Sequence, residues 1–164
     1  MDLYIIRHAW AGHMGDPQWP DDTQRPLSAE GRERFAKLID KLAGGGLAPQ
    51  VIAVSPMVRC VETAEILAER TPSRAQLVQH GELLPGGNHQ RLLEWTAKQA
   101  QRSEQIAWVG HAPDVEQLAA LAIGMPGGSI RFSKGAIAAI RFEASPRAGG
   151  GELRWLVTAK VLGC

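Results

Sequence analysis

Short, fully apolar runs recur along the chain, and polar residues follow each of them at once. The runs occupy residues 3–6, 51–54 and 106–109 and are rich in isoleucine and valine. Runs of this length without polar alternation are typical of strands that are buried on both faces, as in parallel sheets. Parallel strands need long crossover connections, which are usually helices. The chain is therefore constrained to alternate strands with helices around a central sheet.

The segment after residue 28 has the spacing and the end signals of a helix. Ser28 can cap its start, and Phe35 and Leu38 recur at helical spacing on one face. Three glycines at residues 44–46 end it. The same logic predicts a second helix that starts with Ser55 as N-cap and Pro56 as first residue. Further helices are predicted over 89–102 and 115–122, and a weaker strand over 76–79. Two last strands are predicted over 136–143 and 153–161, joined by a turn at 145–151.

This order of elements predicts a three-layer α/β sandwich with a mostly parallel central sheet. The length of 164 residues fits a single domain over residues 1–164. In sheets of this kind, ligands bind beyond the C-terminal ends of the strands. We therefore expect the functional groups in the segments that directly follow the apolar runs.

Composition excludes several classes of partner. A formal net charge of +1 gives no global field for binding nucleic acid or a membrane surface. Two cysteines do not make a disulfide framework, and no stretch approaches the ~18 apolar residues of a membrane span. The N-terminus lacks the pattern of a secretory signal. We therefore expect a cytoplasmic protein.

Polar groups gather at the expected ends of three strands. His8 and His111 both follow apolar runs, and Arg59 lies in the first turn of a predicted helix. A lone histidine is more often a surface or core residue, and Arg59 could instead pair with Glu62. However, a cation at a helix N-terminus opposes the helix dipole, and a bound anion would remove that conflict. The convergence favours an anion site at one edge of the sheet.

Four segments, in order along the chain, resemble the motifs of the histidine phosphatase superfamily, also called phosphoglycerate mutase-like. They are residues 3–9 with their Arg-His pair, residues 25–31, residues 55–64, and residues 110–113 with the second histidine. The short length resembles the SixA-type phosphohistidine phosphatases, which lack the large inserted helical region of mutases and acid phosphatases. The resemblance implies the phosphoglycerate mutase-like fold without that insertion, together with phosphatase activity.

The resemblance also implies a role for each matching residue. His8 would be the nucleophile that forms a covalent phosphohistidine, and His111 would donate to the phosphoryl oxygens. Three arginines would bind those oxygens as well, namely Arg7, Arg25 and Arg59. Ala9 stands where the family motif usually has glycine. We expect an ordinary backbone conformation there, which accommodates the extra methyl group.

The leaving group decides whether an acid is needed. An alkoxide must be protonated, and Glu82, in the loop after the third predicted strand, is the candidate acid. A solvent-exposed loop carboxylate would explain Glu82 equally well. Imidazole has a pKa near ~6.5 and leaves more easily. A small enzyme without a strong acid is therefore better matched to phosphohistidine in a signalling protein, such as a histidine phosphotransfer domain.

Two other functions remain open at this point. The first is a general phosphomonoesterase for a small metabolite, and the second is a non-catalytic module that binds phosphate or a phosphoprotein. Two histidines together with three arginines favour catalysis over binding alone. We expect no metal or other cofactor, because His80 and His89 have no accompanying ligand pattern. Phosphate or sulfate would occupy the site.

Overall fold

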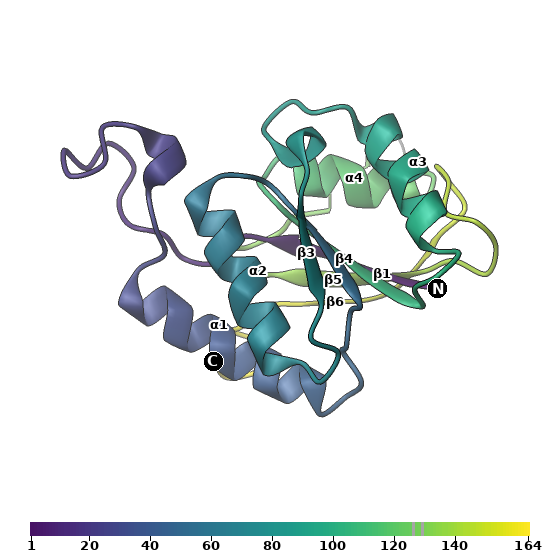
Figure 1. Ribbon diagram of the computed structural model, residues 1–164, viewed down its shortest axis with the longest axis horizontal. Coiled ribbons are helices and arrows are strands. Elements are labelled where there is room, and N and C mark those ends of the chain that lie inside the picture. The colour runs from purple at the N-terminus through teal and green to yellow at the C-terminus, as the bar shows by residue number, and fades with distance from the viewer. Residues whose placement is uncertain (126, 129) are drawn as a thin grey trace.

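The computed structural model describes residues 1–125, 127–128 and 130–164. A six-stranded sheet lies between two pairs of helices (Figure 1). The helices are α1 (Ala29–Ala43) and α2 (Val58–Arg70), which pack on one face, and α3 (His89–Gln99) and α4 (Asp114–Ala122), which pack on the other. This is the predicted three-layer α/β sandwich, and its two cores lie between the sheet and each helical layer.

The sheet has the order β3-β2-β4-β1-β5-β6. Its strands are β1 (Asp2–Arg7), β2 (Val51–Val54), β3 (Gln76–Gln79), β4 (Gln105–Gly110), β5 (Ile137–Arg141) and β6 (Glu152–Val157). The first four strands of this order are parallel, and β5 and β6 add the antiparallel pair. The apolar runs fill the middle of the sheet because helices cover both of its faces there.

The register of the parallel strands places three strand ends side by side. Arg7 on β1 pairs with Gly110 on β4, and Val54 on β2 pairs with Val109. The amide of His8 donates to the carbonyl of Gly110 over 3.0 Å, so the pairing extends one residue past β1. The segment over 9–27, drawn in purple, leaves this edge and projects from the body of the molecule (Figure 1). It contains the short 3-10 helix η1 (Asp22–Gln24).

The start of α2 differs from the prediction. Ser55 and Pro56 are neither N-cap nor first residue, because Met57 is the N-cap and the helix begins at Val58. Ser55 continues the strand pairing instead, since its amide donates to the carbonyl of Val109 over 3.0 Å. Its hydroxyl is fully buried and lies against a side chain from another strand end, so it is not available to cap the helix.

The other helix signals are confirmed more closely than the element ends. The Ser28 hydroxyl accepts from the amide of Gly31 over 3.0 Å, and α1 ends at Ala43 before the glycines. α3 ends at Gln99 rather than at 102, because the chain must turn before it enters β4. β5 and β6 end before the predicted residues 143 and 161, and the chain beyond β6 turns and packs against α1.

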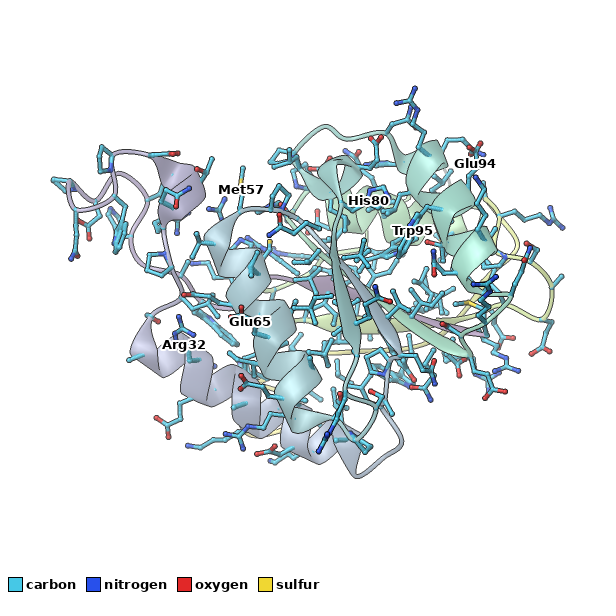
Figure 2. All side chains as sticks on the ribbon, viewed as in Figure 1. Arg32, Met57, Glu65, His80, Glu94 and Trp95 are labelled. Atoms are coloured by element: carbon cyan, nitrogen blue, oxygen red, sulfur yellow. The ribbon has the colours of Figure 1, made fainter. Side chains whose placement is uncertain are left out.

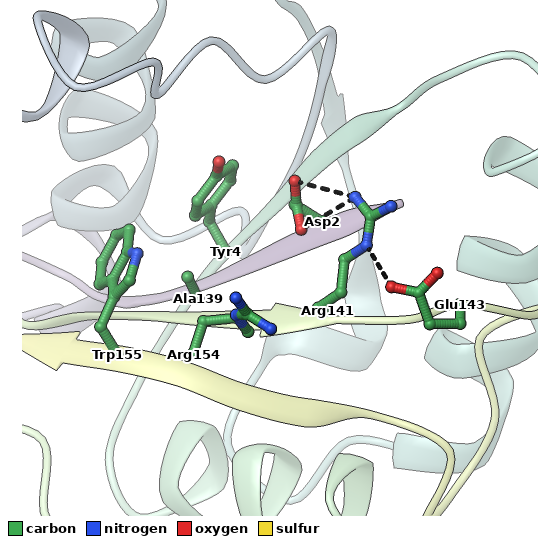
Figure 3. Close-up of a pocket in the computed structure, with 7 residues that line it drawn as sticks. All are labelled: Asp2, Tyr4, Ala139, Arg141, Glu143, Arg154 and Trp155. Carbon is green, nitrogen blue, oxygen red and sulfur yellow. Dashed lines mark hydrogen bonds and ion pairs between the residues drawn. The ribbon is translucent and has the colours of Figure 1, made fainter.

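A hollow of about 540 Å³ opens over β1, β5 and β6 (Figure 3). It lies away from the C-terminal strand ends described above, since Asp2 at the start of β1 lines it. Tyr4 and Trp155 line it, with ring centroids 6.0 Å apart. Arg141 reaches both Asp2 (3.4 Å) and Glu143 (3.0 Å), so its charge is balanced within the protein. These ion pairs connect β5 to the start of β1.

None of the helices in the described ranges is long and apolar enough to cross a membrane.

Gly31 marks the tightest contact between α1 and the projecting segment. A Cβ atom at this position would lie 2.2 Å from the carbonyl oxygen of Trp10. That carbonyl also accepts from the amide of Ser28 over 2.9 Å. The start of α1 and the base of the segment over 9–27 therefore pack with no room for a side chain.

We predict that Gly31→Ala lowers the free energy of unfolding by about 1–3 kcal/mol, because backbone must move to admit the methyl group. Urea unfolding measures the change. Gly44→Ala is the matched control, since Gly44 is helical (φ −61°) and an added Cβ would make an ordinary contact of 3.5 Å with Lys41. Equal stability of the two variants would contradict the prediction.

Candidate active site

A pocket of about 690 Å³ lies at the C-terminal edge of the parallel strands. Its lining comes from the ends of β1 and β4, the segment over 9–27, the start of α2 and the loops at 84–88 and 133–136. The structure brings five of the six residues proposed from the sequence into this lining, namely Arg7, His8, Arg25, Arg59 and His111. Glu82 is not one of the lining residues.

His8 is held by its own neighbour in the chain. Its Nδ1 lies 2.8 Å from the carbonyl oxygen of Ala9. Because a carbonyl only accepts, Nδ1 carries the proton and Nε2 keeps its lone pair. Burial lowers the pKa of His8 to about 3, and His111, Arg59 and Arg7 push it in the same direction. At neutral pH the ring is therefore uncharged and able to act as a nucleophile.

Ala9 fits its position without backbone strain. It is fully buried and its φ is outside the left-handed region. Its amide donates to the hydroxyl of Thr63 over 3.1 Å, and that hydroxyl donates to the carbonyl of Arg59 over 2.7 Å. The residue in place of the usual glycine is thus tied to α2, and the expectation of an ordinary backbone conformation is confirmed.

His111 faces His8 across the ends of β1 and β4. The ring centroids are 5.3 Å apart, and the planes are inclined by 59°. Nε2 of His111 lies 2.9 Å from the hydroxyl of Ser55 and 3.4 Å from Sγ of Cys60. Burial lowers the pKa of His111 to about 4, and the charge of Arg59 adds to this shift. Ser55 holds this ring, a role that its place directly after an apolar run could have suggested.

Each of the three arginines is anchored by a backbone carbonyl. Nη1 of Arg7 donates to Phe132, Nη1 of Arg25 to Gly12 and Nη1 of Arg59 to Asp22, all over 2.7 Å. The Nε atoms of Arg7 and Arg59 are buried and have no hydrogen-bond partner within the part of the chain that the structure describes. Buried donors normally have partners. The described part of the chain therefore leaves two donors of the site arginines unsatisfied.

Asp22 is a site residue that sequence reasoning missed. One carboxylate oxygen accepts from Nε of Arg25 over 2.8 Å, and the other lies 3.1 Å from Nη2 of Arg59. The hydrogen bond from Arg25 is the main cause of its lowered pKa, and the charge of Arg59 adds to it. The signal was the spacing of three residues between Asp22 and Arg25, which suits a local ion pair.

Asp22, and not Glu62 as the sequence allowed, is the carboxylate that pairs with Arg59. The carboxylate of Glu62 does not meet Arg59, because it pairs with Arg32 and accepts from the amide of Leu27 over 2.6 Å. Glu62 therefore connects α2 to the start of α1, on the side away from the pocket lining. Arg59 instead contacts Asp22, and both residues line the pocket.

Glu82 lies in the 3-10 helix η2 (Gly81–Leu83) and turns toward the start of α3. Its carboxylate accepts from the amide of Asn88 over 2.8 Å and lies 3.7 Å from Nη1 of Arg91. These contacts close the loop between η2 and α3. From that loop, Pro85 lines the pocket, and the carboxylate of Glu82 does not.

The rim of the pocket combines exposed basic and apolar side chains. His13 and Met14 come from the projecting segment, and Lys134 comes from the loop before β5. Met57, at the N-terminal end of α2, stands between the helix and that segment (Figure 2). Exposed basic and apolar side chains therefore stand together on the rim of the pocket.

Residues 3–117 match the histidine phosphatase superfamily (branch 1). The chain belongs to this superfamily. An uncharacterized protein of Picosynechococcus sp. is 33% identical over 147 residues, which cover 88% of this chain and 87% of that protein. The matched region includes all five of the proposed residues that line the pocket of this histidine phosphatase.

Solved structures share the fold over nearly the whole length. The protein histidine phosphatase SixA complexed with tungstate has a TM-score of 0.85 at 24% identity and covers 99% of both chains. The alpha-ribazole phosphatase from Shigella flexneri has a TM-score of 0.72 at 19% identity and covers 97% of both. At these identities the likeness establishes the phosphoglycerate mutase-like fold of SixA, which the sequence had predicted.

We predict that acid destabilises this histidine phosphatase through its two site histidines. Their lowered pKa values, about 3 for His8 and about 4 for His111, mean that the folded state binds fewer protons than the unfolded state below pH ~6.5. Stability contributed by the neutral rings is therefore lost as the pH falls from 6.5 toward 4. The loss between pH 7 and pH 5 should be about 2 kcal/mol for each histidine, so about 4 kcal/mol for the two together.

Urea unfolding at both pH values tests this. In the double variant His8→Gln/His111→Gln, the difference between pH 7 and pH 5 should shrink, whatever the absolute stability of the variant. A pH dependence as steep as in the unmodified protein would show that other groups are responsible.

Proposed function

We propose that this histidine phosphatase removes the phosphoryl group from phosphohistidine in a protein such as a histidine phosphotransfer domain. It would do so through a covalent intermediate on His8 and without a metal. Three guanidiniums around the pocket provide the positive charge that phosphoryl transfer requires. The unpaired thiol of buried Cys60 is compatible with a reducing compartment, so we propose that it acts in the cytoplasm.

The proposed reaction has two steps on one nitrogen. Nε2 of His8 attacks phosphorus and forms a P–N bond, while the P–N bond to the substrate imidazole breaks and that imidazole takes a proton from water. Water then attacks the phosphoryl group on His8, and phosphate leaves. The Ala9 carbonyl keeps the proton on Nδ1, so Nε2 is the attacking atom in the first step and the leaving atom in the second. His111 and the arginines stabilise the charged equatorial oxygens.

The pairing of the pocket carboxylate with two arginines is the observation that carries the choice of substrate. Among the described residues that line the pocket, Asp22 is the one carboxylate, and its two arginine contacts lower its pKa. An ionised carboxylate cannot protonate an alkoxide, and Glu82 is bonded to Asn88 instead. A leaving group that needs little protonation therefore suits this site, and imidazole is such a group.

The exposed side chains on the rim of the pocket support a protein as the carrier of that phosphohistidine. A phosphorylated side chain must reach His8 while the rest of its protein stays outside. Exposed Met14 and Lys134 on the rim offer apolar and basic contacts to such a surface. Likeness to the protein histidine phosphatase SixA supports the same choice.

A small phosphorylated metabolite is the second candidate. The alpha-ribazole phosphatase of Shigella flexneri shares the fold over 97% of both chains, so this architecture also serves a metabolite phosphatase. A panel of phosphohistidine proteins and phosphate monoesters, ranked by kcat/KM with EDTA present, separates the two candidates. We expect phosphohistidine to rank first. A monoester at the top of the panel would overturn the proposal.

We predict that rapid quenching with labelled phosphohistidine traps a phosphoryl group on His8 that is labile in acid and stable in base. His8→Ala should abolish both the adduct and turnover, because His111, the other neutral ring in the pocket lining, has its Nε2 against Ser55 and Cys60. A variant that still hydrolyses substrate would exclude His8 as nucleophile. Binding of substrate by the unmodified protein without turnover would favour a non-catalytic module.

We predict that Glu82→Gln changes kcat by less than threefold on phosphohistidine and on an alkyl phosphate alike. The reason is its placement, since its carboxylate contacts Asn88 and Arg91 outside the pocket lining. A general acid would contribute about 10²–10⁴-fold on the alkyl phosphate. A loss of that size, confined to the alkyl phosphate, would restore Glu82 as the leaving-group acid.

A further inference from the structure

We propose that Asp22 is an internal counter-ion of the phosphate site, which competes with the phosphoryl group for Arg25 and Arg59 and so weakens binding of the phosphate product. The proposal rests on the proposed function only in taking this pocket as the place where phosphoryl groups bind. It assigns to Asp22 a control of anion affinity, in addition to any help in positioning the arginines.

The contacts of Asp22 use the same donors that an oxyanion would use. Its two carboxylate oxygens bind two different guanidiniums, Nε of Arg25 at 2.8 Å and Nη2 of Arg59 at 3.1 Å. One guanidinium belongs to the projecting segment and the other to α2. A carboxylate that bridges two arginines in this way resembles two phosphoryl oxygens, because both are negatively charged and both accept hydrogen bonds from guanidinium groups.

Burial shows which partner is fixed and which can yield. The arginine side chains are only 7% and 6% exposed, whereas the side chain of Asp22 is 44% exposed. Both arginines are also anchored at backbone carbonyls, those of Gly12 and of Asp22 itself. The guanidiniums therefore keep their places without the carboxylate, and the carboxylate can turn toward solvent when an anion enters.

The charge balance gives the direction of the effect. Among the residues that the structure describes, the lining holds four cationic side chains, Arg7, Arg25, Arg59 and Lys134, against the single carboxylate of Asp22. The field of Asp22 also reaches across the pocket, since it raises the pKa of His111 against the dominant effect of burial. Without this negative charge, a phosphate dianion would meet a more positive site and bind more tightly.

Tight binding of product is a disadvantage for turnover. Interactions that bind the ground state as well as the transition state do not raise kcat, and they slow release of phosphate. A resident carboxylate lowers the affinity for free phosphate, while Arg7, which lines the same pocket and is not one of the two guanidiniums that Asp22 binds, remains available to the reacting group. Asp22 would thus speed the release of phosphate and so favour turnover.

The test compares Asp22→Asn with Asp21→Asn. Both variants lose one negative charge from the same loop. Asp21 caps η1, a role that asparagine fills equally well, and it does not line the pocket. Isothermal titration of the full chain with inorganic phosphate, and separately with tungstate, measures affinity without turnover. We expect Kd to fall about threefold to tenfold in Asp22→Asn and to change less than twofold in Asp21→Asn.

Damage to the site would give the opposite sign. Misplaced arginines would raise Kd, so an unchanged or raised Kd in Asp22→Asn overturns the proposal. An equal fall in Asp21→Asn also overturns it, because the effect would then be a general charge effect of the loop. With phosphohistidine substrate, Asp22→Asn should lower KM and kcat together. Tighter phosphate binding in a protein that hydrolyses no phosphohistidine would leave this inference standing and reject the proposed function alone.

Discussion

Parallel pairing of β1 with β4 is the constraint on which the site depends. It aligns Arg7 with Gly110, so the two histidines that follow these strands meet with ring centroids 5.3 Å apart. β2 ends at the same edge and brings Ser55 against the second ring. The pairing is stable because helices on both faces bury the apolar runs that form these strands. The two histidines are thus positioned by the buried centre of the sheet.

Concentrating positive charge at that edge creates a second constraint. Guanidiniums repel one another, and each must be anchored before the next can be brought near. Backbone carbonyls provide the anchors, and the carboxylate of Asp22 relieves the repulsion between two of the three. Burial lowers the pKa of both histidines, and the same charges add to this shift, so both rings are neutral at pH 7. A single arrangement therefore gathers the positive charge and keeps the two rings uncharged.

Particular residues mark where sequence reasoning succeeded and where it failed. The apolar runs and the Ser28 cap gave the order of the elements, because these signals depend on neighbours in the chain. Ser55 was expected to cap α2, but a side chain 56 residues away in the sequence is its partner. Glu82 lies in the expected loop, yet its carboxylate turns to the amide of Asn88, six residues further on. Local patterns do not carry the direction of a side chain.

The sequence by itself determined the alternation of strands and helices, the family, and the candidates that follow the strands, because hydrophobic periodicity and short motifs are properties of neighbouring residues. Only the tertiary structure decided which charged groups face one another. Asp22 became a partner of Arg59 because the segment over 9–27 folds back onto α2, and Glu62 was taken up by Arg32. Electrostatic pairing depends on distance in space, and that distance exists only after strands remote in sequence have paired.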